Sequence, residues 1–126
     1  MARTPHYRSK FEESVKNKAV SEGLEDITYE SDILEYLWPE RKAKYTPDYK
    51  LPNGIYIECK GILDRETRKK HLLVREQHPD KELRFIFMRN SRLYKGSKTT
   101  YGEWCDKNNF KWALNKIPKE WYYEQS

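Results

Sequence analysis

The chain has 126 residues, 25 of them basic and 20 acidic, so it carries a formal charge of +5 and has the size of one domain. This size excludes two large independent cores, and no apolar run approaches the roughly 20 residues that span a bilayer or forms a signal segment near residues 1–10. We therefore expect a single-domain cytoplasmic protein with free thiols and a basic surface suited to a polyanion such as nucleic acid.

The first expected element is a helix that begins after Ser9 and ends at Glu22. Residues 9–12 read Ser-Lys-Phe-Glu, the pattern of a capping box, and no Pro or Gly interrupts the segment that follows. The β-branched and aromatic residues of Thr28–Leu37 favour a strand. Trp38–Lys44 is polar and basic with a Pro near its start, so we expect a connector there.

Two further strands, Tyr45–Leu51 and Ile55–Lys60, are predicted to form a hairpin, because the intervening Pro-Asn-Gly is typical of a tight turn. A helix, a strand and a helix are expected after it, at Thr67–His78, Leu83–Met88 and Tyr101–Asn108. The aromatic segment beyond these elements has no assigned form. This order predicts a mixed α/β domain. Aliphatic residues are sparse beside 10 Tyr and 4 Trp, so a second copy of the chain, in a homodimer, is expected to cover part of the core.

The turn decides which side chains of the hairpin share a face. Pro-Asn-Gly suits a three-residue loop with a left-handed Gly, which pairs Leu51 with Ile55 and places Asp48 opposite Glu58. A two-residue Asn-Gly turn would instead pair Pro52 with Ile55 and send the two carboxylates to opposite faces. Both arrangements are compatible with the sequence.

In the three-residue arrangement, Asp48 and Glu58 lie side by side with Lys60 near them. Directly opposed like charges destabilise a sheet unless a cation lies between them. Carboxylate oxygens favour Mg²⁺ or Mn²⁺, which can polarise a phosphate and activate a water molecule, while a Lys stabilises developing negative charge. The alternative is a solvated face with a weak salt bridge, worth about 0 to 1 kcal/mol.

Pro47-Asp48 followed by Glu58-Cys59-Lys60 resembles the signature of the PD-(D/E)xK nuclease superfamily. Further segments resemble the bacteriophage T7 endonuclease I family, a family of Holliday junction resolvases. These segments are Tyr45–Asp48, Leu51–Ile55, Arg68–Leu73, Arg75–Pro79 and Leu93–Ser97. The likeness is looser in the first helix, and residues 33–44 depart from the family.

The resemblance implies a restriction-endonuclease-like α/β fold with a mixed sheet in an intertwined, domain-swapped homodimer. Residues 1–126 would form one nuclease domain, with about residues 1–35 exchanged between subunits and about residues 36–44 as the bridge. The implied function is structure-selective cleavage of four-way junctions and other branched DNA by Mg²⁺- or Mn²⁺-dependent phosphodiester hydrolysis, in the cytoplasm of a phage-infected bacterium.

The resemblance also assigns the site. Asp48, Glu58 and Lys60 take the family's catalytic places, and the carbonyl of Cys59 is expected to contact the first of two metal ions. Glu12, from the partner chain, is expected to reach the second ion. The capping box offers another role for Glu12, and Glu13 remains an alternative carboxylate at this place.

Basic residues of the second helix and of the loop near residue 95 are candidate contacts to DNA phosphates, although a solvated surface is the more common explanation for any single lysine. They are Arg65, Arg68, Lys69, Lys70, Arg75, Lys95 and Lys98. His71 and His78 are expected to serve in packing or capping. Two other functions stay open: a sequence-biased homing or mobile-element endonuclease on the same fold, and a non-catalytic DNA-architectural protein.

Overall fold

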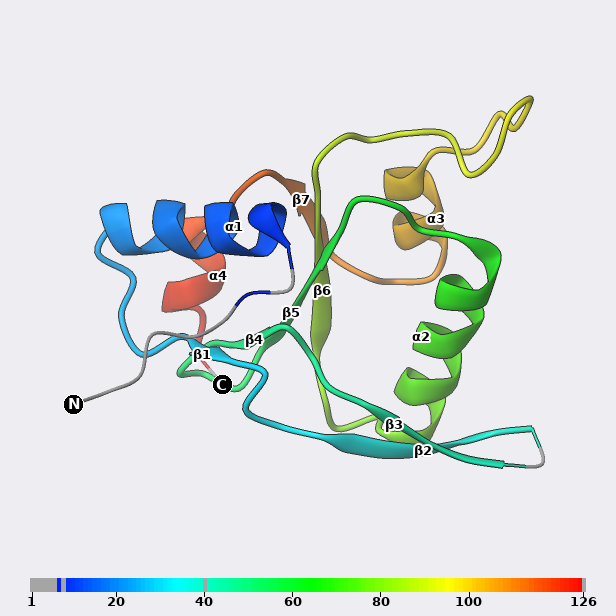
Figure 1. Cartoon of the computed structure of the whole chain (residues 1–126), viewed down its shortest axis with the longest axis horizontal. Coiled ribbons are helices and arrows are strands. Elements are labelled where there is room, and N and C mark those ends of the chain that lie inside the picture. Colours follow the sequence, from blue (N-terminus) through cyan, green and yellow to red (C-terminus); the bar gives the residue numbers. More distant parts are fainter. Residues whose placement is uncertain (1–6, 8, 40, 126) are drawn as a thin grey trace.

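The computed structural model describes residues 7, 9–39 and 41–125. It has the mixed α/β architecture that the sequence predicts (Figure 1). The helices are α1 (Lys10–Ser21), α2 (Arg65–Gln77), α3 (Tyr101–Lys107) and α4 (Lys119–Tyr123). The strands are β1 (Thr28–Tyr29), β2 (Leu34–Trp38), β3 (Arg41–Tyr45), β4 (Tyr49–Lys50), β5 (Tyr56–Lys60), β6 (Leu83–Phe87) and β7 (Trp112–Leu114). No helix among the described residues is long and apolar enough to cross a membrane.

One mixed sheet forms the centre of the molecule, in the strand order β1-β4-β5-β6-β7. β4 and β5 are antiparallel, whereas β5, β6 and β7 run parallel. The parallel connections pass through α2 and α3, which agrees with the need for a crossover between parallel strands. A separate antiparallel hairpin, β2–β3, extends beside α2 (Figure 1).

The sheet separates two apolar clusters, with α1 and α4 on one side and α2 and α3 on the other (Figure 1). Alternation along β6 explains this division, because Ile86 packs in the first cluster while Phe85 and Phe87 pack in the second. Val15 and Ala19 of α1 join the first cluster, four residues apart as expected for one face of a helix. The central strands are thus buried on both faces.

The segment from residue 28 to residue 45 differs from the prediction. The expected single strand Thr28–Leu37 is interrupted after β1, where Glu30 has a φ of 45°, a value that no regular strand allows. The expected connector Trp38–Lys44 is wrong, because Arg41–Tyr45 is strand β3 paired with β2. Polar composition concealed this strand, since its outward-facing residues are charged and only its inward side is covered.

The last two elements, β7 and α4, also lie in the segment to which the sequence assigned no form. They have 3 and 5 residues, too few to show a period. Tertiary contacts fix them instead: Trp121 of α4 packs in the cluster on the α1 side of the sheet. The side chain of Asn53 in the hairpin turn donates to the carbonyls of Trp121 (2.8 Å) and Glu124 (2.9 Å).

The β2–β3 hairpin is held by the end of α2. The amide of Gln77 makes two hydrogen bonds to the backbone of Leu37, accepting from its N–H (2.6 Å) and donating to its carbonyl (2.8 Å). The ring of His78 lies 2.6 Å from the carbonyl of Glu35. These side chains thus provide hydrogen-bond partners for backbone N–H and carbonyl groups along the edge of β2.

Candidate active site

The β4–β5 hairpin has the three-residue loop. Tyr49 pairs with Ile57, and the N–H of Leu51 donates to the carbonyl of Ile55 at 2.8 Å. Gly54 has a φ of 94°, the left-handed conformation that this loop requires. The alternative Asn-Gly turn is therefore wrong. Continuing the observed register by one residue places Asp48 opposite Glu58.

Asp48 is only 1% exposed. Its Oδ2 accepts a hydrogen bond from the N–H of Cys59 (2.8 Å), and its backbone carbonyl accepts one from the N–H of Glu30 (2.8 Å). Burial first, and then the negative charge of Glu58, raise the pKa of Asp48 to about 8. At neutral pH a carboxylate with this raised pKa is mostly protonated unless a cation accompanies it.

Glu58 is 3% exposed and has a partner on each oxygen. The hydroxyl of Tyr45 donates to Oε1 at 2.6 Å, and the ammonium of Lys60 lies 3.1 Å from Oε2. The Lys60 side chain is 25% exposed, so it reaches the surface beside a carboxylate that does not. This side-by-side placement of Glu58 and Lys60 is the arrangement that the sequence predicts for one face of β5.

Glu12 lies in the first turn of α1 and is 7% exposed. Ser9 caps the helix by accepting from the N–H of Glu12 (3.1 Å). The carboxylate of Glu12 instead accepts from the hydroxyl of Tyr29 (2.7 Å), and the hydroxyl of Tyr49 donates to the Glu12 carbonyl (2.7 Å). The neighbouring Glu13 is exposed, so of the two carboxylates Glu12 is the one that faces Asp48.

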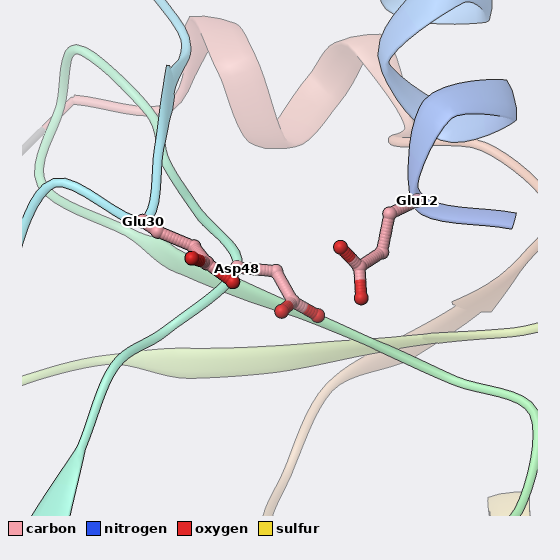
Figure 2. Close-up of side chains that lie close together, drawn as sticks. All are labelled: Glu12, Glu30 and Asp48. Atoms are coloured by element: carbon pink, nitrogen blue, oxygen red, sulfur yellow. The ribbon is translucent and has the colours of Figure 1, made fainter. Parts of the chain in front are cut away.

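A third carboxylate, Glu30, joins Glu12 and Asp48. One oxygen of each residue lies within 4.8 Å of the others, and Figure 2 shows the three side chains converging from α1, from the segment after β1 and from the segment before β4. Sequence reasoning missed Glu30, which follows a two-residue strand and has no partner motif. These three oxygen donors could hold a hard divalent cation.

The lysine and arginine candidates for DNA contact differ in solvent exposure. Arg65, Lys69, Lys95 and Lys98 are exposed. The other three are partly buried and make local contacts. Arg68 donates a hydrogen bond to the carbonyl of Leu63 (2.9 Å). The cation of Lys70 lies 4.7 Å from the centre of the Tyr45 ring, and that of Arg75 lies 4.0 Å from the centre of the Phe110 ring. Lys69 also lies 5.2 Å from the centre of the Trp38 ring.

His71, expected to be a packing residue, is buried in α2 between the rings of Tyr45 and Phe85, with both ring centres 5.0 Å away. Burial lowers the pKa of His71 well below its ordinary value. Neither ring nitrogen has a hydrogen-bond partner among the described residues. A neutral imidazole that packs between two aromatic rings is consistent with the expected role.

Comparison with known proteins gives a consistent result. The sequence model of the family described as "Phage endonuclease I" matches residues 1–126. The chain is 44% identical over 119 residues to "Endonuclease I" of Escherichia phage T7, covering 94% of this chain and 79% of that protein. It is 48% identical over 113 residues to "Endodeoxyribonuclease 1" of Enterobacteria phage T3, covering 89% of this chain and 74% of that protein.

Proposed function

Because the chain belongs to the phage endonuclease I family, we propose that it is a metal-dependent endodeoxyribonuclease that cuts four-way junctions and other branched DNA by phosphodiester hydrolysis. The observation that carries this proposal is the set of buried carboxylates beside one ammonium group. Asp48 and Glu58 are opposed across β4 and β5, Glu12 approaches from α1, and Lys60 lies next to Glu58. Burial of carboxylates costs free energy, and a DNA-binding protein without catalytic activity would not require such buried acids.

We propose two Mg²⁺ or Mn²⁺ ions for each site. Asp48, Glu58 and the carbonyl of Cys59 would hold the first, and Asp48, Glu12 and Glu30 would hold the second. The oxygen donors fit such ions, since burial first, and then the negative charges of Glu58 and Glu12, raise the pKa of Asp48 when no cation is present. When bound, the ions would supply charge to polarise a phosphate and to activate a water molecule.

The residues of the chain have distinct tasks in this proposal. Lys60 supplies a fixed positive charge for the negative charge that develops on phosphate oxygens, and its pairing with Glu58 holds it in place. The N–H of Cys59 fixes the orientation of Asp48. The exposed basic residues Arg65 and Lys69 of α2, together with Lys95 and Lys98, would bind the phosphates of the DNA arms without reading their sequence.

We further propose a homodimer of restriction-endonuclease-like domains in which residues 1–35 are exchanged and residues 36–44 form the bridge. The support is the register of the β2–β3 hairpin, in which Leu34 pairs with Tyr45 and Trp38 with Arg41. Two copies that opened this hairpin could make the same pairs with each other, and the partner's Glu12 and Glu30 would then take the places seen within one chain. Position 40, within the bridge, lies outside the described residues.

The function is tested by cleavage of a four-way junction and of a linear duplex with the same arm sequences, at equal Mg²⁺ concentration. We expect paired nicks near the branch point, little cutting of the duplex and no cutting in EDTA. Cleavage of the duplex at one defined sequence would instead identify a sequence-biased nuclease. Tight junction binding with no cleavage in Mg²⁺ or Mn²⁺ would identify an architectural protein and refute the proposal.

A further inference from the structure

Tyr45 is a buried residue at the end of β3, where the β2–β3 hairpin meets the candidate site. Its hydroxyl donates to Oε1 of Glu58 over 2.6 Å, and Lys60 occupies the other oxygen. A hydroxyl that donates one hydrogen bond to a carboxylate leaves a second lone pair on that oxygen. Tyr45 therefore fixes the rotation of the Glu58 carboxyl group without blocking it as a metal ligand.

The ring of Tyr45 is itself held on two sides by α2. The ring of His71 stands edge-on to it, with centres 5.0 Å apart and an angle of 88° between the planes. The ammonium of Lys70 lies 4.7 Å from the centre of the Tyr45 ring. These contacts restrict the movement of the buried Tyr45 ring, so packing holds the hydrogen-bond donor in position.

We propose that Tyr45 is a positioning residue for the nuclease reaction, acting through Glu58 on metal binding. This inference rests on the proposed function, because it requires Glu58 to be a metal ligand. A hydrogen bond from a buried donor holds a ligating carboxylate in the orientation that binds the ion, and removal of such a partner typically weakens metal affinity about 10- to 100-fold. In this proposal Tyr45 would act on the ion through Glu58 and would not itself be a ligand.

Tyr45 also connects the site with the rest of the chain. It pairs with Leu34 across the hairpin, packs with Tyr36 and Val74 in one cluster and contacts α2 through His71. A displacement of the hairpin therefore moves the donor to Glu58. In this way the bridge proposed between subunits would be coupled to the orientation of one metal ligand.

The test is the substitution Tyr45→Phe, which removes one oxygen atom and keeps the ring contacts. Tyr56→Phe is a matched control, because Tyr56 is buried in the same cluster as Tyr45 and also donates to a carboxylate, that of Asp32 (2.5 Å), which is not one of the proposed metal ligands. Mn²⁺ affinity is measured by electron paramagnetic resonance, and junction cleavage is measured across a range of Mg²⁺ concentrations.

We expect Tyr45→Phe to weaken Mn²⁺ binding about 10- to 100-fold and to raise the half-saturating Mg²⁺ concentration by a similar factor, with most of the cleavage rate regained at saturating Mg²⁺. Tyr56→Phe should change neither value more than about twofold. In a Glu58→Gln background, adding Tyr45→Phe should have no further effect on Mn²⁺ affinity. Unchanged Mn²⁺ affinity in the Tyr45→Phe variant, or an equal loss in the Glu58→Gln background, would overturn the inference.

If Tyr45→Phe fails to fold, the same question is answered with 3-fluorotyrosine placed only at position 45 or only at position 56. The ¹⁹F resonance at position 45 should shift on Mg²⁺ saturation, and the one at position 56 should not; no shift at position 45 refutes the proposed role. Failure of the function itself has a different signature, because the unmodified chain would then bind no Mn²⁺ and cut no junction.

Discussion

The Oδ2 atom of Asp48 accepts a hydrogen bond from the N–H of Cys59 at 2.8 Å, at the end of the β4–β5 hairpin that lies away from its turn. This bond ties a buried carboxylate of one strand to the backbone of the next. It also places Cys59, whose carbonyl we propose as a ligand of the first ion, directly beside Asp48. A shift of either strand by one residue would break the bond and separate Asp48 from Glu58.

The substitution Glu58→Gln should abolish junction cleavage, with a loss of at least about 10³-fold, because a neutral amide is a poor ligand for a divalent ion and no longer pairs with Lys60. Binding of the junction in Ca²⁺, measured by gel shift, should stay within about threefold of the parent, since few phosphate contacts are lost. Glu13→Gln is a suitable control because Glu13 is exposed. Cleavage by the Glu58→Gln variant at the parent rate would contradict the assignment of Glu58 as a metal ligand.

The substitution Asp48→Asn should stabilise the metal-free protein. The pKa of Asp48 is raised to about 8 in the folded state, mainly by burial. An acid with a raised pKa in the folded state destabilises the fold as pH rises from its unfolded pKa of about 4 to about 8, and has no further effect above that. In EDTA, unfolding by urea should therefore show falling stability across this range.

The Asp48→Asn variant should show little of this fall in stability with pH. At pH 8 its free energy of unfolding should exceed that of the parent by about 1 to 3 kcal/mol. Addition of Mg²⁺ should stabilise the parent and not the variant. Equal pH profiles for the two proteins in EDTA would mean that the carboxylate is not in the environment described.

Exchange of residues 1–35 is tested by mixing chains with different defects. A Glu12→Ala chain and a Glu58→Ala chain should each be inactive alone. In an exchanged heterodimer one composite site has both defects and the other has none, so co-refolded chains should nick junctions at one strand. Mixtures that stay as inactive as the separate variants would show that each site is built from a single chain.

Cross-strand cysteines give a structural test of the same exchange. Glu35 and Lys44 are exposed partners in the β2–β3 register, at a separation suited to a disulfide. Oxidation of the double variant Glu35→Cys/Lys44→Cys at low protein concentration should yield a covalent dimer on a non-reducing gel. The native Cys59 and Cys105 are buried, so a Glu35→Cys single variant serves as the control. A monomer with an internal disulfide would contradict the exchange.

The sequence predicts the β4–β5 hairpin correctly because turn chemistry is local: the Pro-Asn-Gly loop fixes the register, and the register brings Asp48 to Glu58. The helices with clear caps are also close to their expected bounds, as α1 begins after Ser9 and ends one residue before Glu22. These features depend on neighbouring residues and need no knowledge of the fold.

Glu30 could not be predicted in the same way. It reaches Asp48 only because the chain leaves β1 with a positive φ and because its N–H bonds to the Asp48 carbonyl, neither of which has a periodic signal. The hydrogen bond from Tyr45 to Glu58 is equally hidden, since it joins two strands of different sheets. Tertiary structure, rather than local pattern, assembles these parts of the site.

Asp48 is held by the segment that follows β1, through the N–H of Glu30, and by β5, through the N–H of Cys59. The bond from Cys59 forms within the local β4–β5 hairpin, whereas the bond from Glu30 requires β1 to pair with β4. In a partly folded chain the acids of the proposed metal site would therefore be separated from one another. We expect metal affinity, and with it cleavage, to depend on completion of the pairing between β1 and β4.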